Sequence, residues 1–511
     1  MADEQKPRSM TVQAFWLMIA KTLAFIFAFA LPVLLTRTLS QNDYGLFKQV
    51  FLIITTASAL LPFGFGLSAF YYLPREKDTA RRAQIILNIL LFNGIMGAFA
   101  CLLLFFWPEL IASIFKDPTV PTYASSIGIV ILLSLFSSFL ETVPVANQEL
   151  RLAAVFIVFA QLSRSILLIA AAVVFDSVQA LIYAAIVHGA LQCMVLLWYV
   201  NSRFPKFWRA FDWTLTGNQI AYAVPFGLAG LLYTIQTDLH NYFVSNRFNA
   251  ATFAVYSIGV SQVPLVGILR DSVSQVILPR ISYLQKEGQT RNIVVLLANA
   301  VRKLAAFYLP VFALLLVTGR EFLTVMFTSA YAQSWPIFAI NLLMLPISLM
   351  EVDAVVRAYE GYRFFLLKLQ VVLSIVMVFA LWWGIASFGL IGAVSVVVMI
   401  NFLLRVVLAA RFCRVLDVKI RDVLLLKDVG KLVVASAIAG FLSFFVRSLV
   451  MPNGARPFAV LVICSGIFGL TYVLSVILLG VPTVDERDKA RRGFARLQQF
   501  VYFRGSANSV P

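Results

Sequence analysis

The sequence contains few charged residues and few cysteines, and each shortage excludes a class of protein. Only 13% of the 511 residues are charged and 61% are hydrophobic, whereas about 25% of the residues in a soluble domain carry a charge. The chain is therefore too apolar for a water-soluble enzyme, a disordered protein or a collagen-like fibre. The four cysteines have neither metal-ligand nor CxxC spacing, so we interpret them as small packing residues that form no disulfide.

The sequence also lacks a polar stretch long enough for a catalytic domain. The longest segment outside the apolar runs is the basic, amphipathic tail 481–511, which we expect to lie on the inner face of a membrane. No paired-carboxylate or DxD-like motif occurs in the short outer connections. We therefore predict that the protein is not an enzyme and has no catalytic residue, metal or cofactor. The first apolar run contains Lys21 and exceeds the core of a signal peptide, so we expect it to stay uncleaved.

Apolar runs of about 20 residues, the length that spans a bilayer, are abundant. We predict an all-α, polytopic membrane protein with about fourteen transmembrane helices. Their expected bounds are 12–36, 44–72, 85–107, 122–147, 152–175, 178–200, 217–237, 251–278, 301–319, 333–357, 364–387, 389–410, 431–450 and 457–480.

The basic residues predict the orientation of the chain. Lysine and arginine cluster in every second connection, around 75–82, 203–209, 280–303 and 411–431, and again in the tail. By the positive-inside rule both termini lie in the cytoplasm. These clusters account for most of the net charge of +17, and they need only anionic lipid as a partner. We expect no nucleic acid partner.

A repeated tripeptide indicates an internal repeat. Leu73-Pro74-Arg75 ends the second predicted span, and Leu278-Pro279-Arg280 ends the eighth, 205 residues later. Because six spans separate the two copies, the halves share an orientation, as in parallel-repeat transporters. We predict an N-terminal lobe at 1–210 and a C-terminal lobe at 211–415. Two additional helices at 416–480 and the cytoplasmic tail at 481–511 lie outside the repeat.

Short motifs follow one another along the chain: Thr36-Arg37-Thr38-Leu39, Asn42-Asp43-Tyr44-Gly45-Leu46-Phe47, Ala223-Val224-Pro225-Phe226-Gly227-Leu228, Asp238, Val255-Tyr256-Ser257, Leu278-Pro279-Arg280, Tyr308-Leu309-Pro310, Met326-Phe327 and Tyr331-Ala332. This ordered series resembles the polysaccharide flippases of the multidrug/oligosaccharidyl-lipid/polysaccharide (MOP) exporter superfamily. It departs from the usual pattern at Phe248-Asn249, where proteins of that superfamily commonly have Leu-Gly.

The resemblance implies a MATE-like, V-shaped bundle of two lobes that opens a central cavity to each side of the membrane in turn. It implies a flippase of the bacterial cytoplasmic membrane that moves lipid-linked oligosaccharide units on an undecaprenyl-pyrophosphate carrier. The units would serve exopolysaccharide or lipopolysaccharide O-antigen synthesis. The expected partners are this substrate, membrane lipids and the polysaccharide polymerase machinery.

Cations inside the predicted spans are the candidate substrate-binding residues, because a charge at the bilayer centre costs about 2.5–3.5 kcal/mol on insertion scales. Lys21, Lys48 and Arg270 lie in spans that line the cavity in the resembled fold, where they would bind an anionic pyrophosphate. Alternatively, Lys48 reaches the interface and Arg270 forms an internal ion pair. Arg447, near a span end, is expected to reach the interface. The role of Arg164 stays open, because its helix is expected toward the outside of the lobe.

Two intramembrane acids, Asp238 and Glu141, are candidates for coupling transport to an ion gradient or for gating. Asp238 could equally cap the outer end of its helix, and Glu141 could lie at the cytoplasmic end of a tilted helix. The sequence does not choose between proton, sodium and uncoupled mechanisms. We also weigh three other functions: a lipid II flippase, a multidrug or organic-cation antiporter, and a membrane polymerase or glycosyltransferase. The lysines in the first lobe disfavour cationic cargo, and the short outer connections disfavour an enzyme.

Overall fold

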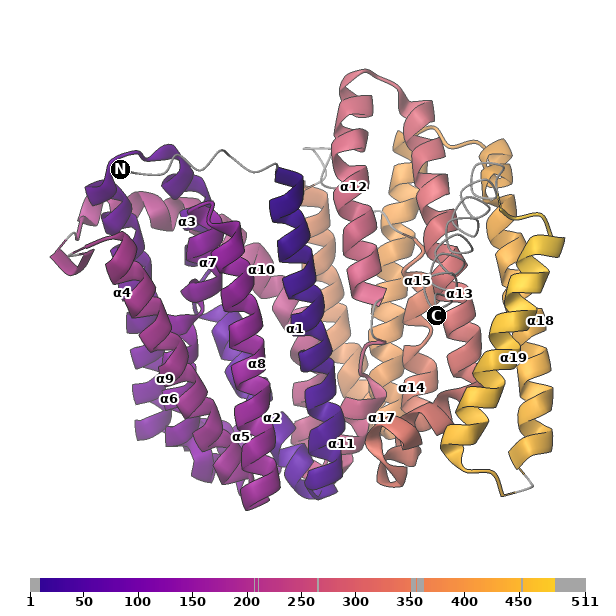
Figure 1. Cartoon of the computed structure of the whole chain (residues 1–511), viewed down its shortest axis with the longest axis horizontal. Helices are drawn as coiled ribbons and strands as arrows, with labels where there is room; N and C mark the ends of the chain where they lie inside the picture. The colour runs from indigo at the N-terminus through magenta and orange to yellow at the C-terminus, as the bar shows by residue number, and fades with distance from the viewer. Residues whose placement is uncertain are drawn as a thin grey trace, which may run out of the picture. The chain divides into compact units, whose positions relative to one another are not determined.

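The computed structural model describes residues 10–205, 207–209, 211–263, 266–350, 355, 363–451 and 454–482. All regular secondary structure in this part of the chain is helical (Figure 1), as the sequence predicts. The chain divides into two compact units. Unit 1 comprises Met1–Pro264, Met326–Asn341 and Arg363–Ile400, and unit 2 comprises Leu265–Val325, Leu342–Tyr362 and Asn401–Pro511.

Unit 1 is a helical bundle in which sequential helices and distant helices pack together. Within it α1 packs along α8, α4 along α6, α6 along α9, and α2 against α11. Its helices and 3-10 turns are α1 (Met10–Thr38), α2 (Gln41–Leu60), η1 (Phe65–Leu67), α3 (Ser68–Tyr72), η2 (Leu73–Arg75), α4 (Thr79–Phe106), α5 (Glu109–Ile114), η3 (Val120–Tyr123), α6 (Ala124–Ser137), α7 (Phe139–Ala146), α8 (Leu150–Phe175), α9 (Val178–Arg203), η4 (Phe207–Arg209), α10 (Trp213–Arg247), α11 (Ala250–Gly259), η5 (Ser329–Ser334), α14 (Trp335–Asn341) and α17 (Arg363–Val415) as far as Ile400.

Polar side chains fix where several helices of unit 1 begin. The Ser40 hydroxyl accepts the backbone N–H of Asp43 at the start of α2, and Ser177 does the same for Ala180 at the start of α9. Asn249, the residue that departs from the family pattern, accepts the N–H of Thr252 at 2.9 Å and caps α11. Its backbone is extended, so this turn does not require glycine.

Two close backbone contacts hold α2 and the turn after it. A Cβ atom on Gly45 would lie 1.8 Å from the carbonyl oxygen of Ala250, and one on Gly227 would lie 2.0 Å from that of Phe63. Gly64 has a φ of +68° and breaks the second predicted span, so that Gln41–Leu60 and Phe65–Arg75 are bent by 48°. Glycine is required here because any side chain would collide or strain the backbone.

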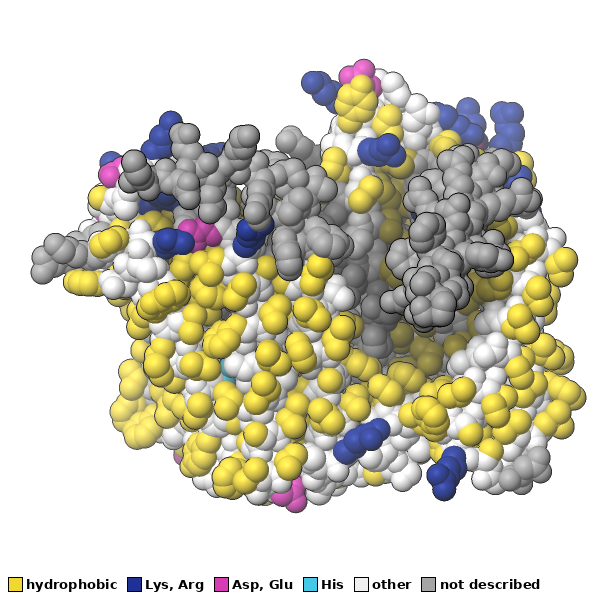
Figure 2. Space-filling model, viewed as in Figure 1, with side chains coloured by type: hydrophobic (Ala, Val, Ile, Leu, Met, Phe, Trp, Pro, Cys, Tyr) yellow, Lys and Arg dark blue, Asp and Glu magenta, His cyan; other side chains and the backbone are white. Residues whose placement is uncertain are grey.

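The surface of unit 1 has the composition of a surface that faces lipid. On α4 the side chains of Ile95, Phe99, Leu102 and Phe105 are all more than half exposed. Figure 2 shows hydrophobic side chains over the face formed by α4, α8 and α9, with charged side chains gathered beyond its two edges. Exposed apolar area on this scale is unstable in water and is expected for a membrane-embedded bundle.

Unit 2 contains the remaining helices. The helix pair α18 and α19 packs together, and Gly440 of α18 lies against Ala313 of α13. Its elements are α12 (Val266–Lys286), α13 (Thr290–Phe327, up to Val325), α15 (Met344–Ile347), η7 (Ile420–Leu426), α18 (Lys427–Val450), α19 (Pro457–Leu478) and the end of α17 (Arg363–Val415) from Asn401 onward.

Fourteen spans are not confirmed by the helices. Within the described residues, ten helices are long and apolar enough to cross a membrane, or eleven if the bent α2 pair counts as one. The difference arises at three places. The single helix α17 contains the eleventh and twelfth predicted spans, joined through a kink at Gly389, whose φ is +58° and ψ −134°. The helix α10, which contains the seventh predicted span, is rich in polar residues. The predicted eighth span is broken between α11 and α12.

The tripeptide repeat adopts two local structures. Leu73-Pro74-Arg75 forms the 3-10 turn η2, whereas Leu278-Pro279-Arg280 lies inside α12, which continues to Lys286. The helix that contains the expected end of the eighth span at Leu278 thus continues eight residues beyond it. The lobe boundaries predicted from this repeat stay a prediction, and most of the tail 481–511 lies outside the described residues.

Candidate functional site

Lys48 and Arg164 form a pair of cations inside unit 1. Lys48 lies on α2 with its Nζ 6.0 Å from the ring centre of Tyr44, and Arg164 lies on α8 with its Cζ 5.6 Å from the ring of Phe51. Tyr44 and Phe51 are buried. The two cations are close enough for their charges to repel each other. The structure thus turns Arg164 toward α2, not toward the outside of the lobe.

Among the described residues, no carboxylate forms an ion pair with Lys48 or Arg164. The faces of Tyr44 and Phe51 compensate part of the positive charge, by about 0.5–2 kcal/mol per contact. A half-buried pair of cations without an acid is costly. This arrangement can therefore bind an anion, and a phosphate group would relieve both the repulsion and the poor solvation.

Lys21 and Glu141 lie near each other in unit 1. Lys21 is on α1 and Glu141 on α7, both side chains are exposed, and their charges attract each other. They form no ion pair among those that the structure describes. Lys21 is therefore accessible to an external anion, and Glu141 is an acid close enough to attract it when none is bound.

A hydrogen bond connects Asp238 of α10 to α2. The Thr56 hydroxyl donates to Oδ2 of Asp238 at 3.1 Å, and the Tyr242 hydroxyl, one turn further along α10, donates to the carbonyl of Leu52 at 3.4 Å. Asp238 lies nine residues before the end of α10 at Arg247, so the alternative that it caps its helix is wrong. Its carboxylate connects α10 to the helix that carries Lys48.

Thr56 is a polar residue that sequence reasoning missed. The sequence points to Thr55, because Thr55 shares a helical face with Lys48. In the structure the Thr55 hydroxyl donates to the carbonyl of Phe51 at 2.8 Å within α2. The neighbouring Thr56 contacts Asp238 instead. Helical spacing from Lys48 favours Thr55, whereas the contact of Thr56 depends on where α10 crosses α2, which the sequence does not reveal.

Arg270 lies on α12 in unit 2 and is half-buried. Lys21, Lys48, Asp238 and Glu141 all belong to unit 1. The structure thus brings Lys48 together with Arg164, and Lys21 together with Glu141. A site shared by Lys21 and Arg270 stays a prediction.

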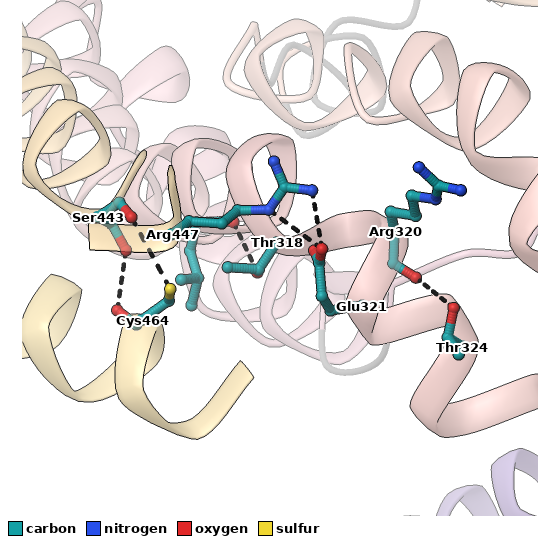
Figure 3. Close-up of polar contacts among 8 residues, drawn as sticks. Thr318, Arg320, Glu321, Thr324, Ser443, Arg447 and Cys464 are labelled. Carbon is teal, nitrogen blue, oxygen red and sulfur yellow. Dashed lines mark hydrogen bonds and ion pairs between the residues drawn. The ribbon is translucent and has the colours of Figure 1, made fainter. Parts of the chain in front are cut away.

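Unit 2 contains a buried ion pair that the sequence did not predict. Glu321 of α13 is 2% exposed, and its Oε1 accepts hydrogen bonds from Nε and Nη2 of Arg447 on α18 at 3.1 and 2.8 Å (Figure 3). Arg447 therefore does not simply reach the interface. The sequence places Glu321 just beyond a predicted span, whereas α13 continues six residues past it to Phe327.

The comparisons with known proteins decide the family. A family model described as "Polysaccharide biosynthesis protein" matches residues 34–336, more than half of the chain. The chain belongs to this family. No curated protein sequence matches it.

Solved structures with similar folds are MOP-superfamily transporters and a flippase. A structure described as "Lipid II flippase MurJ, inward closed conformation" has a TM-score of 0.71 at 15% identity, covering 91% of this chain and 98% of the other. An inward-facing multidrug resistance MATE family transporter of the MOP superfamily has a TM-score of 0.58 at 14% identity, covering 80% and 99%. An outward-facing one has a TM-score of 0.54 at 15% identity, covering 80% and 95%. These matches establish a MurJ- and MATE-like membrane fold.

Proposed function

We propose that this protein is a flippase that moves lipid-linked oligosaccharide units across the bacterial cytoplasmic membrane. Its expected substrate is a sugar unit on an undecaprenyl-pyrophosphate-type carrier, destined for exopolysaccharide or O-antigen synthesis. Membership of the polysaccharide biosynthesis family supports this proposal, and so does the fold shared with MurJ and MATE proteins. Transport proceeds by alternating access and changes no covalent bond, so no catalytic residue is needed.

The uncompensated cations of unit 1 are the observation that carries the choice of cargo. A pyrophosphate group is anionic and cannot cross about 30 Å of hydrocarbon without counter-charge. Lys48 and Arg164 lie together with no described acid paired to either, and Lys21 is accessible. We propose that Lys21, Lys48 and Arg270 bind the pyrophosphate, and that Asp238 and Glu141 couple transport to an ion gradient or gate it.

Orientation and partners complete the proposal. The basic connections support a cytoplasmic location for both termini. A flippase that delivers sugar units to the outer leaflet must supply a polymerase there, so the polysaccharide polymerase machinery is the expected protein partner.

A lipid II flippase is the second candidate. The structural match to MurJ, which covers 98% of that chain, favours it, and its cargo has the same lipid-pyrophosphate chemistry. An organic-cation antiporter would need acids where this chain has Lys48 and Arg164.

The test is polymer export in cells that depend on this protein. Lys21→Ala or Arg270→Ala should abolish surface polymer and cause the lipid-linked precursor to accumulate, with normal protein in the membrane. Lys21→Arg should retain more export than Lys21→Glu, and Lys77→Ala, an exposed loop change, should have no effect. Unchanged export in both alanine variants would reject the cationic path. Accumulation of the cell-wall precursor instead would favour the lipid II alternative.

A further inference from the structure

Unit 1 contains a polar cavity of about 470 Å³ that the transport proposal does not use. Its lining comes from η2, the start of α4, the turn between α7 and α8, and the end of α9. The cavity therefore lies where four apolar spans begin or end: Thr79–Phe106, Val120–Ala146, Leu150–Phe175 and Val178–Arg203. Its volume is in the range of small-ligand pockets, about 300–1,000 Å³.

Two of the charged residues that line the cavity neutralise each other. Nε of Arg203 lies 2.9 Å from Oε1 of Glu149, and the Tyr199 hydroxyl donates to Oε2 of the same carboxylate at 2.9 Å. Asn147 in turn donates to the Tyr199 hydroxyl at 3.2 Å. The pair of opposite charges contributes no net charge to the cavity.

Arg82 is positioned by neutral groups and keeps its charge uncompensated. It donates to the Oδ1 atom of Asn147, and its Cζ lies 5.7 Å from the ring centre of Phe204. Its Nε is buried without a hydrogen-bond partner. Among the described residues no carboxylate pairs with it. A fixed guanidinium of this kind is suited to a phosphate group.

Glu76 supplies an uncompensated negative charge to the same cavity. Its Oε1 accepts the backbone N–H groups of Lys77 and Asp78 at 3.0 and 3.1 Å, and within the part of the chain that is described no cationic side chain pairs with it. The cavity therefore presents one available positive charge and one available negative charge, which is complementary to a small zwitterion.

Exposed aromatic side chains place the cavity at the level of lipid head groups. Trp208, Phe211 and Trp213 follow the lining residue Phe204 in the sequence, and they are 55%, 40% and 78% exposed. Tryptophan and tyrosine concentrate at the membrane–water interface, so the two tryptophans indicate that level. A lipid in the adjacent leaflet can therefore reach the cavity with its head group while its chains stay in the hydrocarbon.

We propose that this cavity binds the head group of a phosphatidylethanolamine-type phospholipid. The phosphate contacts Arg82, and the primary ammonium contacts Glu76. The inference is independent of the transported substrate, because it concerns a structural or regulatory lipid held by unit 1.

The test is native mass spectrometry of the full chain in detergent with added phosphatidylethanolamine, phosphatidylglycerol or phosphatidylcholine. The wild-type protein should retain phosphatidylethanolamine most strongly. Arg82→Gln should weaken this retention about tenfold, the loss expected for one charge-assisted contact. Arg81→Gln, which removes the same charge from an exposed neighbour that does not line the cavity, should change it by less than about twofold.

Glu76→Gln gives an independent check that leaves the contacts of Arg82 intact. It should remove the preference for phosphatidylethanolamine over phosphatidylglycerol while both lipids still bind. Equal retention of all three lipids by the wild type, or equal loss in the Arg81 and Arg82 variants, would overturn the proposal. Release of the bound lipid by inorganic phosphate at a concentration similar to that of the added lipid would instead assign the site to a soluble anion and overturn the lipid assignment.

Discussion

Arg447 donates two hydrogen bonds to a single oxygen of Glu321, and it thereby connects α18 to α13 inside unit 2 (Figure 3). The second oxygen, Oε2, is buried and has no partner in the described structure. The carboxylate therefore depends on Arg447 for its stability in an apolar environment. This pair joins one of the two helices outside the predicted repeat to the repeat itself.

Removing one partner of this pair should be strongly destabilising. Arg447→Leu should lower the free energy of unfolding by about 3–5 kcal/mol, because it leaves the charge of Glu321 buried and unpaired. Thermal unfolding in detergent measures the loss. Arg320→Leu is the matched control, because the Arg320 side chain is exposed and points away from the pair. The double variant Glu321→Leu/Arg447→Leu should recover most of the loss; a double variant no more stable than Arg447→Leu alone would contradict this account.

Gly45 should tolerate no side chain. In Gly45→Ala the new Cβ meets the Ala250 carbonyl at 1.8 Å, so α2 and α11 must separate. We expect destabilisation by about 2–4 kcal/mol and a lower yield of folded protein. Gly66→Ala provides the comparison, since a Cβ there meets nothing within 4 Å. The measurement is the midpoint of thermal unfolding for both variants, and similar midpoints would show that the close approach of the two helices is unimportant.

The hydrogen bond from Thr56 to Asp238 allows a test of ion coupling that separates it from folding. If Asp238 carries the coupling ion, Asp238→Asn should make export insensitive to dissipation of the ion gradient. The asparagine side chain keeps an oxygen that can accept the hydrogen bond from the Thr56 hydroxyl. Thr56→Val removes the hydroxyl that donates to Asp238, a hydrogen bond worth about 1–2 kcal/mol, but keeps the carboxylate, and should reduce the rate while leaving gradient dependence in place. Export assays with and without an ionophore measure both effects. A gradient response of Asp238→Asn equal to that of the wild type would assign coupling elsewhere.

Particular residues show how much of the fold and of the candidate site can be predicted from the sequence. The predicted spans 364–387 and 389–410 place a break at residue 388, directly before Gly389, where α17 kinks. The motif series identifies the family, because short ordered motifs depend on local chemistry. Glu321, Thr56 and the inward side of Arg164 are not predictable in this way. Each depends on which helix packs against which, and that information lies in contacts between residues more than 100 positions apart.

The positive charges of Lys48 and Arg164 should lower the stability of the protein and support transport. Because the two cations repel each other without an acid, Arg164→Met removes both the repulsion and the cost of a poorly solvated charge, and it should raise the unfolding temperature. The same substitution removes the positive charge beside Lys48, a residue of the proposed phosphate site, and should lower export, about tenfold if one charge-assisted contact is lost. Lys48→Met should behave alike, and the double variant should gain less stability than the sum of the two, since the repulsion can be removed only once.

Lys77→Met is the control for this pair, because it removes an exposed charge outside the bundle and should change neither quantity. Thermal unfolding and export are measured on the same preparations and strains. A destabilised Arg164→Met protein would show that the guanidinium supports packing against Phe51 more than it repels Lys48. Full export by a stabilised Arg164→Met protein would separate the cation pair from the substrate path. The cation pair therefore serves transport only if Arg164→Met raises the unfolding temperature and lowers export.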